Sequence, residues 1–405
     1  MSNYATENLR TLALVGHGSC GKTTLIEAML YRAGMIPEMG SIQRGTTMCD
    51  NDLLEKEVGH SIRLAVAHID TAMTDLTPVR IHILDTPGYP DYLGQDMSAL
   101  DAVKSVCAVI DPTKGPELLT RRLMAMAKER GLCRMIVINH MDDPEADLEK
   151  CLRELQETWG PGVLPINLPT RNRTHVIDCF DREDGDSDIM TVDDVHRAFI
   201  ERVVEEDDEM LERYLEEGSI DPRALHPLVT KALREGHVIP VCFCSAKKLI
   251  GIRDFMKVII RHLPSPAEAN DALFIKRDGT PFKTYPDKNL PLIAQVFKIV
   301  NDPFIGKIGI FRVHQGTLKK DDVIYVDDKR AIKAPRPLIL QGKHTQETDF
   351  LSPGDIGAIA KVDEVNYGSV IHGDPLDSGV RMRPINFPRP MYGLAIRPAR
   401  RGDES

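Results

Sequence analysis

A glycine-rich segment near the N-terminus limits what this chain can fold into more than any other feature. Residues Gly16 to Thr23 read G-H-G-S-C-G-K-T and fit the pattern G-x-x-x-x-G-K-[ST]. They follow an apolar run, Thr11–Gly16, that predicts a β-strand, and they open an amphipathic stretch, Lys22–Arg32, that predicts a helix. A strand, a tight glycine turn and a helix are the surroundings in which this pattern cradles phosphates. The sequence therefore predicts a P-loop.

Each part of this loop has an expected role. The backbone N–H groups should face phosphate oxygens, and the helix that follows adds the positive end of its dipole. We expect Lys22 to reach the β- and γ-phosphates and the Thr23 hydroxyl to bind Mg²⁺. The residues expected to hold the phosphates are Gly16, His17, Gly18, Ser19, Cys20, Gly21, Lys22, Thr23 and Thr24.

Short apolar runs alternate with amphipathic stretches along much of the chain. The runs are nearly continuous in apolar residues, as expected when helices cover both faces of a parallel sheet. Strands are predicted at Thr11–Gly16, Val79–Leu84, Ser105–Asp111, Arg134–Asn139 and Val238–Phe243, and helices at Lys22–Arg32, Gln95–Val103, Leu118–Arg130 and Ile252–His262. This alternation predicts a doubly wound α/β domain.

A second element of the site follows the strand predicted at Val79–Leu84. Asp85-Thr86-Pro87-Gly88 lies at its carboxyl end, beside the P-loop in a doubly wound sheet. There the Asp85 carboxylate can hold Mg²⁺, and the Gly88 N–H can sense a γ-phosphate. The tetrapeptide is short, and its position after a P-loop makes it informative.

A third element predicts which base is bound. Asn139-His140-Met141-Asp142 ends one predicted strand, and Ser245-Ala246-Lys247 ends the last one. A carboxylate at Asp142 can accept hydrogen bonds from N1–H and the N2 amino group of guanine, a donor pair that adenine lacks. The residues expected around the base are Asn139, His140, Asp142, Ser245, Ala246 and Lys247. The three elements together predict binding of GTP and GDP with Mg²⁺.

Between about residues 160 and 236 the strand–helix rhythm stops, which predicts an insertion. Its amphipathic stretch Asp193–Glu217 carries an acidic face, which is either a solvated helix surface or a docking surface for a basic partner. We therefore expect a P-loop domain over residues 1–280 that contains this insertion.

After Leu263-Pro264-Ser265-Pro266, short strands separated by Gly and Pro turns predict a small antiparallel β-barrel over residues 281–385. The strands are predicted at Leu292–Ile299, Lys307–Gln315, Asp322–Val326 and Ile356–Lys361. Residues 386–405 would form the start of a further domain or a flexible tail.

The charge is uneven between these parts. Residues 291–405 hold 17 Lys and Arg against 14 Asp and Glu, a net charge of +3. The preceding residues hold 34 against 47, a net charge of −13. A polyanionic partner should therefore meet the barrel. The overall charge of −10 argues against a protein that binds DNA or an anionic membrane by bulk charge.

Cysteine usage and the N-terminus bear on location. The eight cysteines form no paired framework, and Cys242-x-Cys244 lacks the second pair that a zinc site needs, so we expect reduced thiols. Met1–Asn8 shows no signal peptide, and no apolar run reaches the roughly 18 residues of a membrane span. We expect a cytoplasmic protein and a monomer.

The P-loop, D-T-P-G, N-x-x-D and S-A-K motifs, in this order, resemble those of translational GTPases. Residues 212–218 (ERYLEEG) and 263–266 (LPSP) resemble the insertion and domain exit of bacterial elongation factor G and its paralogues, and 298–307 (KIVNDPFIGK) and 316–318 (GTL) resemble its barrel. The resemblance covers about residues 8–385. It implies ribosome binding controlled by GTP, which orders switches at about 40–64 and 86–97. The barrel would then face ribosomal RNA, and the insertion would meet a stalk protein.

The chain differs from this family at residues that take part in GTP hydrolysis and in binding the guanine base. Tyr89 stands where the family has a His that positions the attacking water, and a neutral phenol with a pKa near 10 cannot supply an imidazole's donor or charge. Ser19 replaces a P-loop Asp, and Val58 replaces a switch Arg. His140 stands in place of the Lys that covers the guanine ring, and its ring can still stack.

The binding residues survive better than the hydrolytic ones. Ser61 keeps a hydroxyl for Mg²⁺ beside Thr23 and Asp85. The catalytic candidates are Lys22, Gly88 and the divergent Tyr89. We therefore expect GTP and GDP binding with slow hydrolysis, partly restored by the ribosome.

Two functions stay open. The first is a ribosome-associated GTPase resembling elongation factor G, which the preserved barrel favours. The second is a regulatory module that binds GTP and GDP with little or no hydrolysis, which Tyr89, Ser19 and Val58 favour. A peptide-release GTPase is disfavoured by the long insertion. In the family three more domains follow the barrel, whereas here Pro390–Ile396 reads like the first strand of the next one, so the chain is either naturally short or cut at a domain boundary.

Overall fold

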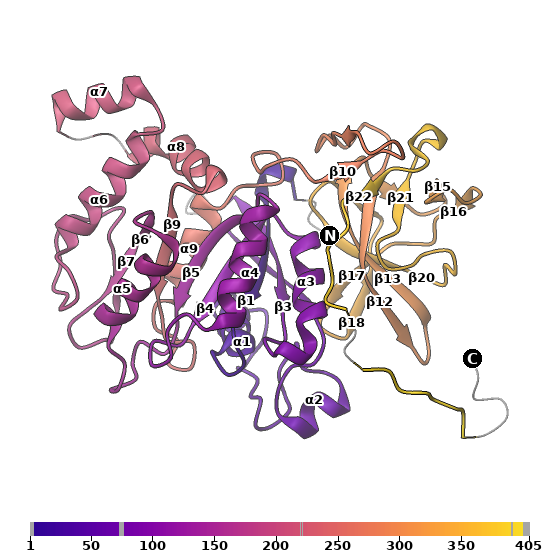
Figure 1. The fold of residues 1–405 in the computed structure, drawn as a ribbon, viewed down its shortest axis with the longest axis horizontal. Helices are drawn as coiled ribbons and strands as arrows, with labels where there is room; N and C mark the ends of the chain where they lie inside the picture. Colours follow the sequence, from indigo (N-terminus) through magenta and orange to yellow (C-terminus); the bar gives the residue numbers. More distant parts are fainter. Residues whose placement is uncertain (1–3, 73–76, 219, 221, 390–391, 400–405) are drawn as a thin grey trace.

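The computed structural model describes residues 4–72, 77–218, 220, 222–389 and 392–399. Its N-terminal part is built on a seven-stranded sheet (Figure 1). The strands are β1 (Leu9–Val15), β2 (Ala65–Ala72), β3 (Pro78–Asp85), β4 (Ser105–Ile110), β5 (Cys133–Ile138), β6 (Val163–Pro165) and β9 (Ile239–Phe243). Their order is β2-β3-β1-β4-β5-β9-β6, with β2 antiparallel to β3 and the other pairs parallel.

Helices cover both faces of this sheet, which explains its apolar strands. In β1, Ala13 and Val15 face one core and Leu12 and Leu14 face the other. The first core includes side chains of α3 (Leu93–Ala102), α4 (Leu118–Glu129) and α5 (Leu148–Trp159), and the second those of α1 (Lys22–Arg32), α6 (Val192–Val204), α8 (Pro222–Glu235) and α9 (Ile252–His262). The doubly wound α/β prediction is confirmed, and α1 and α9 have the predicted bounds.

Some elements differ from the expectation. The stretch Asp193–Glu217 is two helices rather than one, because the chain turns after α6 and a new helix, α7 (Asp208–Glu217), begins. The Asp207 carboxylate caps α7 by accepting a hydrogen bond from the Met210 N–H at 3.0 Å. The elements that the sequence did not predict include the strand β2 and the short helix α2 (Leu53–Val58), together with β6, α5 and α8 of the N-terminal part. The hairpin of β7 (Asn167–Pro169) and β8 (Val176–Asp178) lies between β6 and α6.

The C-terminal part is an open antiparallel barrel, as predicted. Its main sheet has eight strands in the order β16-β15-β21-β12-β13-β20-β17-β18. These are β12 (Ile293–Asp302), β13 (Gly306–Gln315), β15 (Val323–Val326), β16 (Ile332–Lys333), β17 (Leu338–Gln341), β18 (His344–Glu347), β20 (Ile356–Ala360) and β21 (Val370–His372). Short ladders join β14 (Leu318–Lys319) to β19 (Phe350–Leu351), and β10 (Phe274–Ile275) to β11 (Pro281–Phe282) and β22 (Arg381–Met382).

The strand predicted at Pro390–Ile396 is not seen. Its first two residues lie outside the described residues, and the following Tyr392–Ile396 segment has no strand geometry. Tyr392, Leu394 and Ile396 are exposed. None of the described strands pairs with residues 392–396, and a segment without a pairing partner does not form a strand.

The barrel and the sheet domain share core residues and hydrogen bonds. Barrel side chains such as Phe297 and Ile310 belong to the same core as Met97 of α3. The Lys298 ammonium donates to the Leu64 carbonyl, and the Leu64 N–H donates to Gln95 Oε1 of α3 at 3.1 Å. The same interface contains further bonds from the Gly342 N–H to the Val66 carbonyl (2.9 Å) and from Arg312 to the Ala102 carbonyl (3.1 Å).

Within the described ranges, no helix combines the length and apolarity that crossing a membrane requires. The eight cysteines are all buried and form no disulfide. Burial raises the pKa of their thiols, for example to about 12 in Cys133, so these side chains act as small apolar groups.

His262, the last residue of α9, makes the stability of the fold depend on pH. Burial, with the nearby Arg261 charge, lowers its pKa to about 3, and its ring packs edge-on to Phe180. An unfolded imidazole titrates near pH 6.5, so below that pH the unfolded chain binds a proton that the folded chain does not. Between about pH 6 and 4, the wild type should therefore lose about 1.4 kcal/mol of stability per pH unit more than His262→Phe. Urea unfolding across this range checks it, and parallel pH curves for the two proteins would contradict it.

Candidate functional site

The P-loop joins β1 to α1 and requires glycine at defined places. Gly21 precedes α1 with a φ of +91°, and a Cβ there would lie 2.3 Å from Asn139 Nδ2. A Cβ on Gly16 would lie 2.5 Å from the Val109 carbonyl oxygen. Helix α1 has no side-chain cap, so its first N–H groups have no side-chain acceptor and can serve an anion.

Lys22 is buried inside this loop. Its ammonium donates to the carbonyls of Gly16 at 2.8 Å and His17 at 3.0 Å. Gly88, from the corner after β3, is pressed against the same group, since a Cβ on Gly88 would lie 2.2 Å from Lys22 Nζ. The predicted phosphate-contacting residues Lys22 and Gly88 therefore meet at one point. Of the other predicted phosphate-binding residues, Cys20 is buried and Thr24 is partly buried.

The three predicted metal ligands also meet. The Thr23 hydroxyl donates to Asp85 Oδ2 at 2.7 Å and lies 3.2 Å from the Ser61 hydroxyl. Asp85 Oδ1 is buried and has no hydrogen-bond partner. Burial raises the pKa of Asp85 to about 7, and the charge of Asp50 adds to the rise.

Asp50 is a buried acid that sequence reasoning missed. Its Oδ2 also lacks a hydrogen-bond partner. Burial raises the pKa of Asp50, and the hydroxyls of Ser61 and Thr47 partly oppose that rise. Buried carboxylate oxygens without donors are costly unless a cation compensates them, and carboxylates and hydroxyls are the ligands that Mg²⁺ prefers. The donor set around Thr23 therefore fits a divalent cation.

Tyr89 covers the P-loop. Its ring lies so close to Gly18 that a Cβ on that glycine would fall 2.2 Å from Tyr89 Cζ. The rings of His60 and His17 lie 4.5 and 5.9 Å from it. The Tyr89 phenol thus lies over the P-loop at Gly18, and His60, from the segment before Ser61, is a neighbour that the sequence did not reveal.

At the base end of the site, Asn139 is fully buried and links two loops. Its Nδ2 donates to the Cys20 carbonyl at 3.0 Å, and its Oδ1 accepts from the Ala246 N–H at 2.9 Å. Asn139 thereby holds the P-loop and the Ser245–Lys247 loop next to each other at the carboxyl end of the sheet. His140 beside it has a φ of +57° and lies 3.8 Å from Asp111.

Asp142 is poised as an ionised acceptor. Burial alone would raise its pKa, but hydrogen bonds from Ser245 and Lys248 outweigh burial and lower it. Lys248 Nζ lies 3.1 Å from Asp142 Oδ2, and the side chains of Lys247 and Lys248 are both exposed. Lys248 is therefore a neighbour of Asp142 that the sequence did not single out.

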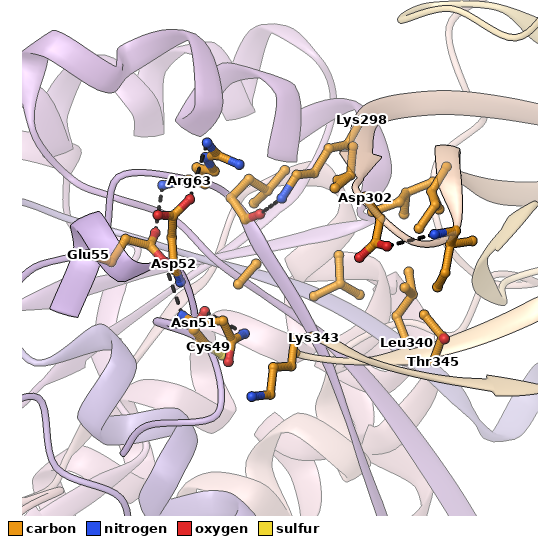
Figure 2. Close-up of a pocket in the computed structure, with 18 of the residues that line it drawn as sticks. Cys49, Asn51, Asp52, Glu55, Arg63, Lys298, Asp302, Leu340, Lys343 and Thr345 are labelled. Carbon is orange, nitrogen blue, oxygen red and sulfur yellow. Dashed lines mark hydrogen bonds and ion pairs between the residues drawn. The ribbon is translucent and has the colours of Figure 1, made fainter. Parts of the chain in front are cut away.

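A separate cavity of about 660 Å³ lies between α2 and the barrel hairpin β12–β13 (Figure 2). Arg63 and Asp52 form an ion pair on one side of it, and Asp302 accepts from backbone N–H groups of its own turn on the other. None of the predicted nucleotide-binding residues lines it. The cavity is therefore distinct from the predicted nucleotide site.

Two family models match the chain. The model described as the elongation factor Tu GTP-binding domain matches residues 7–265, and the model of elongation factor G domain 2 matches residues 291–373. A crystal structure of a Thermus thermophilus protein superimposes with a TM-score of 0.76 at 29% sequence identity, covering 90% of this chain and 54% of that one.

Curated relatives match over most of this chain. An elongation factor G-like protein of Mycobacterium tuberculosis (strain ATCC 25618 / H37Rv) is 29% identical, covering 98% of this chain and 59% of that protein. Elongation factor G of Fervidobacterium nodosum is 28% identical with the same coverage, 98% and 59%. An elongation factor G-like protein of Thermotoga maritima is 27% identical, covering 98% and 58%. The chain thus spans about three fifths of the length of these relatives.

Proposed function

The chain belongs to the family of the elongation factor Tu GTP-binding domain, and on that basis we propose that it is a GTP-binding translation factor resembling elongation factor G. In this proposal the nucleotide controls binding to the ribosome, and GTP hydrolysis is slow. The observation that carries it is the position of Asn139, which is bonded to the P-loop at Cys20 and to the base loop at Ala246. One residue thus joins the parts that would hold phosphate and guanine.

The roles follow from the geometry. The P-loop, residues 16–24, and the Lys22 ammonium would hold the phosphates, and the ionised Asp142 would accept the two donors of guanine. Thr23, Ser61 and Asp85, with Asp50 beside them, would hold Mg²⁺. When bound, that ion supplies positive charge to the phosphate oxygens.

Slow hydrolysis is proposed from the contacts of Tyr89. Its phenol rests on Gly18, where an attacking water would have to be oriented, and a neutral phenol neither accepts a proton readily nor carries charge near pH 7. His60 holds its Nδ1 3.1 Å from the Ser61 carbonyl, so that nitrogen is engaged with the backbone. Binding without rapid turnover is the expected result.

Replacing Tyr89 by histidine tests this role. An imidazole at this position can orient water and take part in proton transfer, so Tyr89→His should raise ribosome-stimulated single-turnover hydrolysis by about tenfold or more. Tyr92→His is the matched control, because the Tyr92 ring also lies near the His60 ring, at 6.2 Å, while the three atoms nearest to a Cβ on Gly18 all belong to Tyr89. An unchanged rate in Tyr89→His would show that Tyr89 does not limit hydrolysis. Hydrolysis by the wild type at the rate of an ordinary elongation factor would contradict slow turnover.

The second candidate is a regulatory module that binds GTP and GDP with little or no hydrolysis. The covered P-loop and the Tyr89 contact favour it, whereas the match to elongation factor G domain 2 favours a ribosome-directed factor. Co-sedimentation with ribosomes in GTP and in GDP separates the two. GTP-dependent pelleting supports the translation factor, and absence from the pellet in both nucleotides supports the module.

We also propose the arrangement of domains and partners. Residues 1–280, with the insertion at about 160–236, would bind nucleotide, residues 281–385 would face ribosomal RNA, and the acidic insertion would meet a stalk protein. The exposed acidic side chains of α6 and α7 support the last of these. The factor would act in the cytoplasm as a monomer.

A further inference from the structure

Asp96 occupies a position where an acid is unexpected. It lies on α3 with Leu93, Met97 and Leu100, which all pack into the core, and its own exposed fraction is 0%. Helical spacing favours an apolar residue on such a face. A buried carboxylate there costs free energy unless a specific partner compensates it.

The partner of Asp96 is the backbone of Gly88. Asp96 Oδ1 accepts a hydrogen bond from the Gly88 N–H at 3.1 Å. Asp96 Oδ2 is buried without a donor, because the nearby Thr86 hydroxyl donates instead to the Leu14 carbonyl at 2.8 Å. Burial raises the pKa of Asp96 to about 6, although Thr86, Lys22 and the Gly88 N–H oppose the rise. The group is therefore mainly ionised at pH 7.

The Gly88 N–H is the donor expected to bind a γ-phosphate. Gly88 touches the P-loop, since a Cβ on it would lie 2.2 Å from both Lys22 Nζ and the Gly16 carbonyl oxygen. An anionic oxygen from α3 therefore already holds the donor that a third phosphate would use. It does so within the electrostatic influence of the phosphate-binding lysine.

We propose that Asp96 is a specificity-determining residue that substitutes for the γ-phosphate at Gly88 and thereby favours GDP over GTP. The inference rests on the proposed nucleotide-binding function. GDP can bind with the Asp96–Gly88 bond intact, whereas GTP must break it and bring another anion close to the Asp96 carboxylate. A ligand shifts an equilibrium only by its differential affinity for two states, and this contact lowers the affinity of the state that GTP requires.

Titrations with GDP and with the non-hydrolysable analogue GppNHp, both with Mg²⁺, test the proposal. Asp96→Leu removes the competing acceptor and suits the apolar surroundings, so the Kd for GppNHp should fall about tenfold while that for GDP changes less than about twofold. Asp96→Asn keeps an acceptor oxygen but loses the charge, and a smaller fall in the same direction is expected. Asp96→Asn also tests the proposal if Asp96→Leu does not fold.

Asp101→Asn is the matched control, because Asp101 is a buried acid on the same helix whose partner is Arg130. It should leave the ratio of the two Kd values unchanged. Equal changes for GDP and GppNHp in both Asp96 variants, or the same change in ratio in Asp101→Asn, would overturn the inference and leave the proposed function standing. A wild-type chain that binds neither guanine nucleotide would overturn both.

Discussion

Replacing Asp142 by asparagine should weaken GTP binding at least about 100-fold and make xanthosine triphosphate the better ligand. The Asp142 carboxylate is ionised and is oriented by Ser245 and Lys248, so it can accept from N1–H and the N2 amino group of guanine. An asparagine turns one of those acceptors into a donor, which opposes the amino group and matches the carbonyl that xanthine carries in its place. Competition titrations with GTP, xanthosine triphosphate and ATP measure the change.

Asp143→Asn is the control for this substitution. Asp143 neighbours Asp142, and its Oδ1 accepts from the Glu145 N–H at 2.9 Å, a bond that asparagine can retain. Its affinity for GTP should match the wild type. Retention of GTP affinity in Asp142→Asn, or equal binding of ATP and GTP by the wild type, would show that Asp142 does not read the base.

Replacing Asn139 by alanine should cost about 3 kcal/mol of stability and most of the nucleotide affinity. The substitution leaves the Cys20 carbonyl and the Ala246 N–H without their partner at a site that is fully buried. It also releases the P-loop from the base loop, so binding must first reorder both. Urea unfolding and nucleotide titration measure the two effects.

Asn167→Ala separates the two consequences. Asn167 is a buried asparagine of β7 that bonds the Phe243 N–H at 2.7 Å and the Phe243 carbonyl at 3.3 Å. Its loss should reduce stability by a similar amount while nucleotide affinity is kept. If both variants lost affinity equally, the effect of Asn139 would be one of general stability, and its role as the link between loops would be wrong.

The sequence predicted the parts of the fold that depend on local pattern. The strand–loop–helix of the P-loop follows from Gly16, Gly21 and the apolar run before them, and α1 begins and ends where its periodicity does. Amphipathic spacing continues through Asp193–Glu217 and does not separate α6 from α7, whereas the Asp207 cap that starts α7 is a local signal in the sequence.

The missed residues of the candidate site are those defined by tertiary contact. Helical spacing places Asp96 on the apolar face of α3, and Asp50 reads as an ordinary surface acid, but nothing local shows that a glycine corner or a second carboxylate will lie beside them. The contact of Lys248 with Asp142 likewise depends on how one loop closes. Barrel pairing between distant strands, such as β12 with β21, is set by long-range contacts that strand propensity does not specify.

The main-chain groups of Leu64 have a mechanical consequence. One is held by Gln95 at the start of α3, and the other by Lys298 of the barrel. Burial lowers the pKa of Lys298 to about 8. Breaking its hydrogen bond to the Leu64 carbonyl would leave a buried ammonium group without an acceptor, which is costly, so this contact resists separation. A movement of the first turn of α3 should therefore move the barrel with it. The main chain of Leu64 is therefore one of several contacts through which α3 and the barrel are coupled.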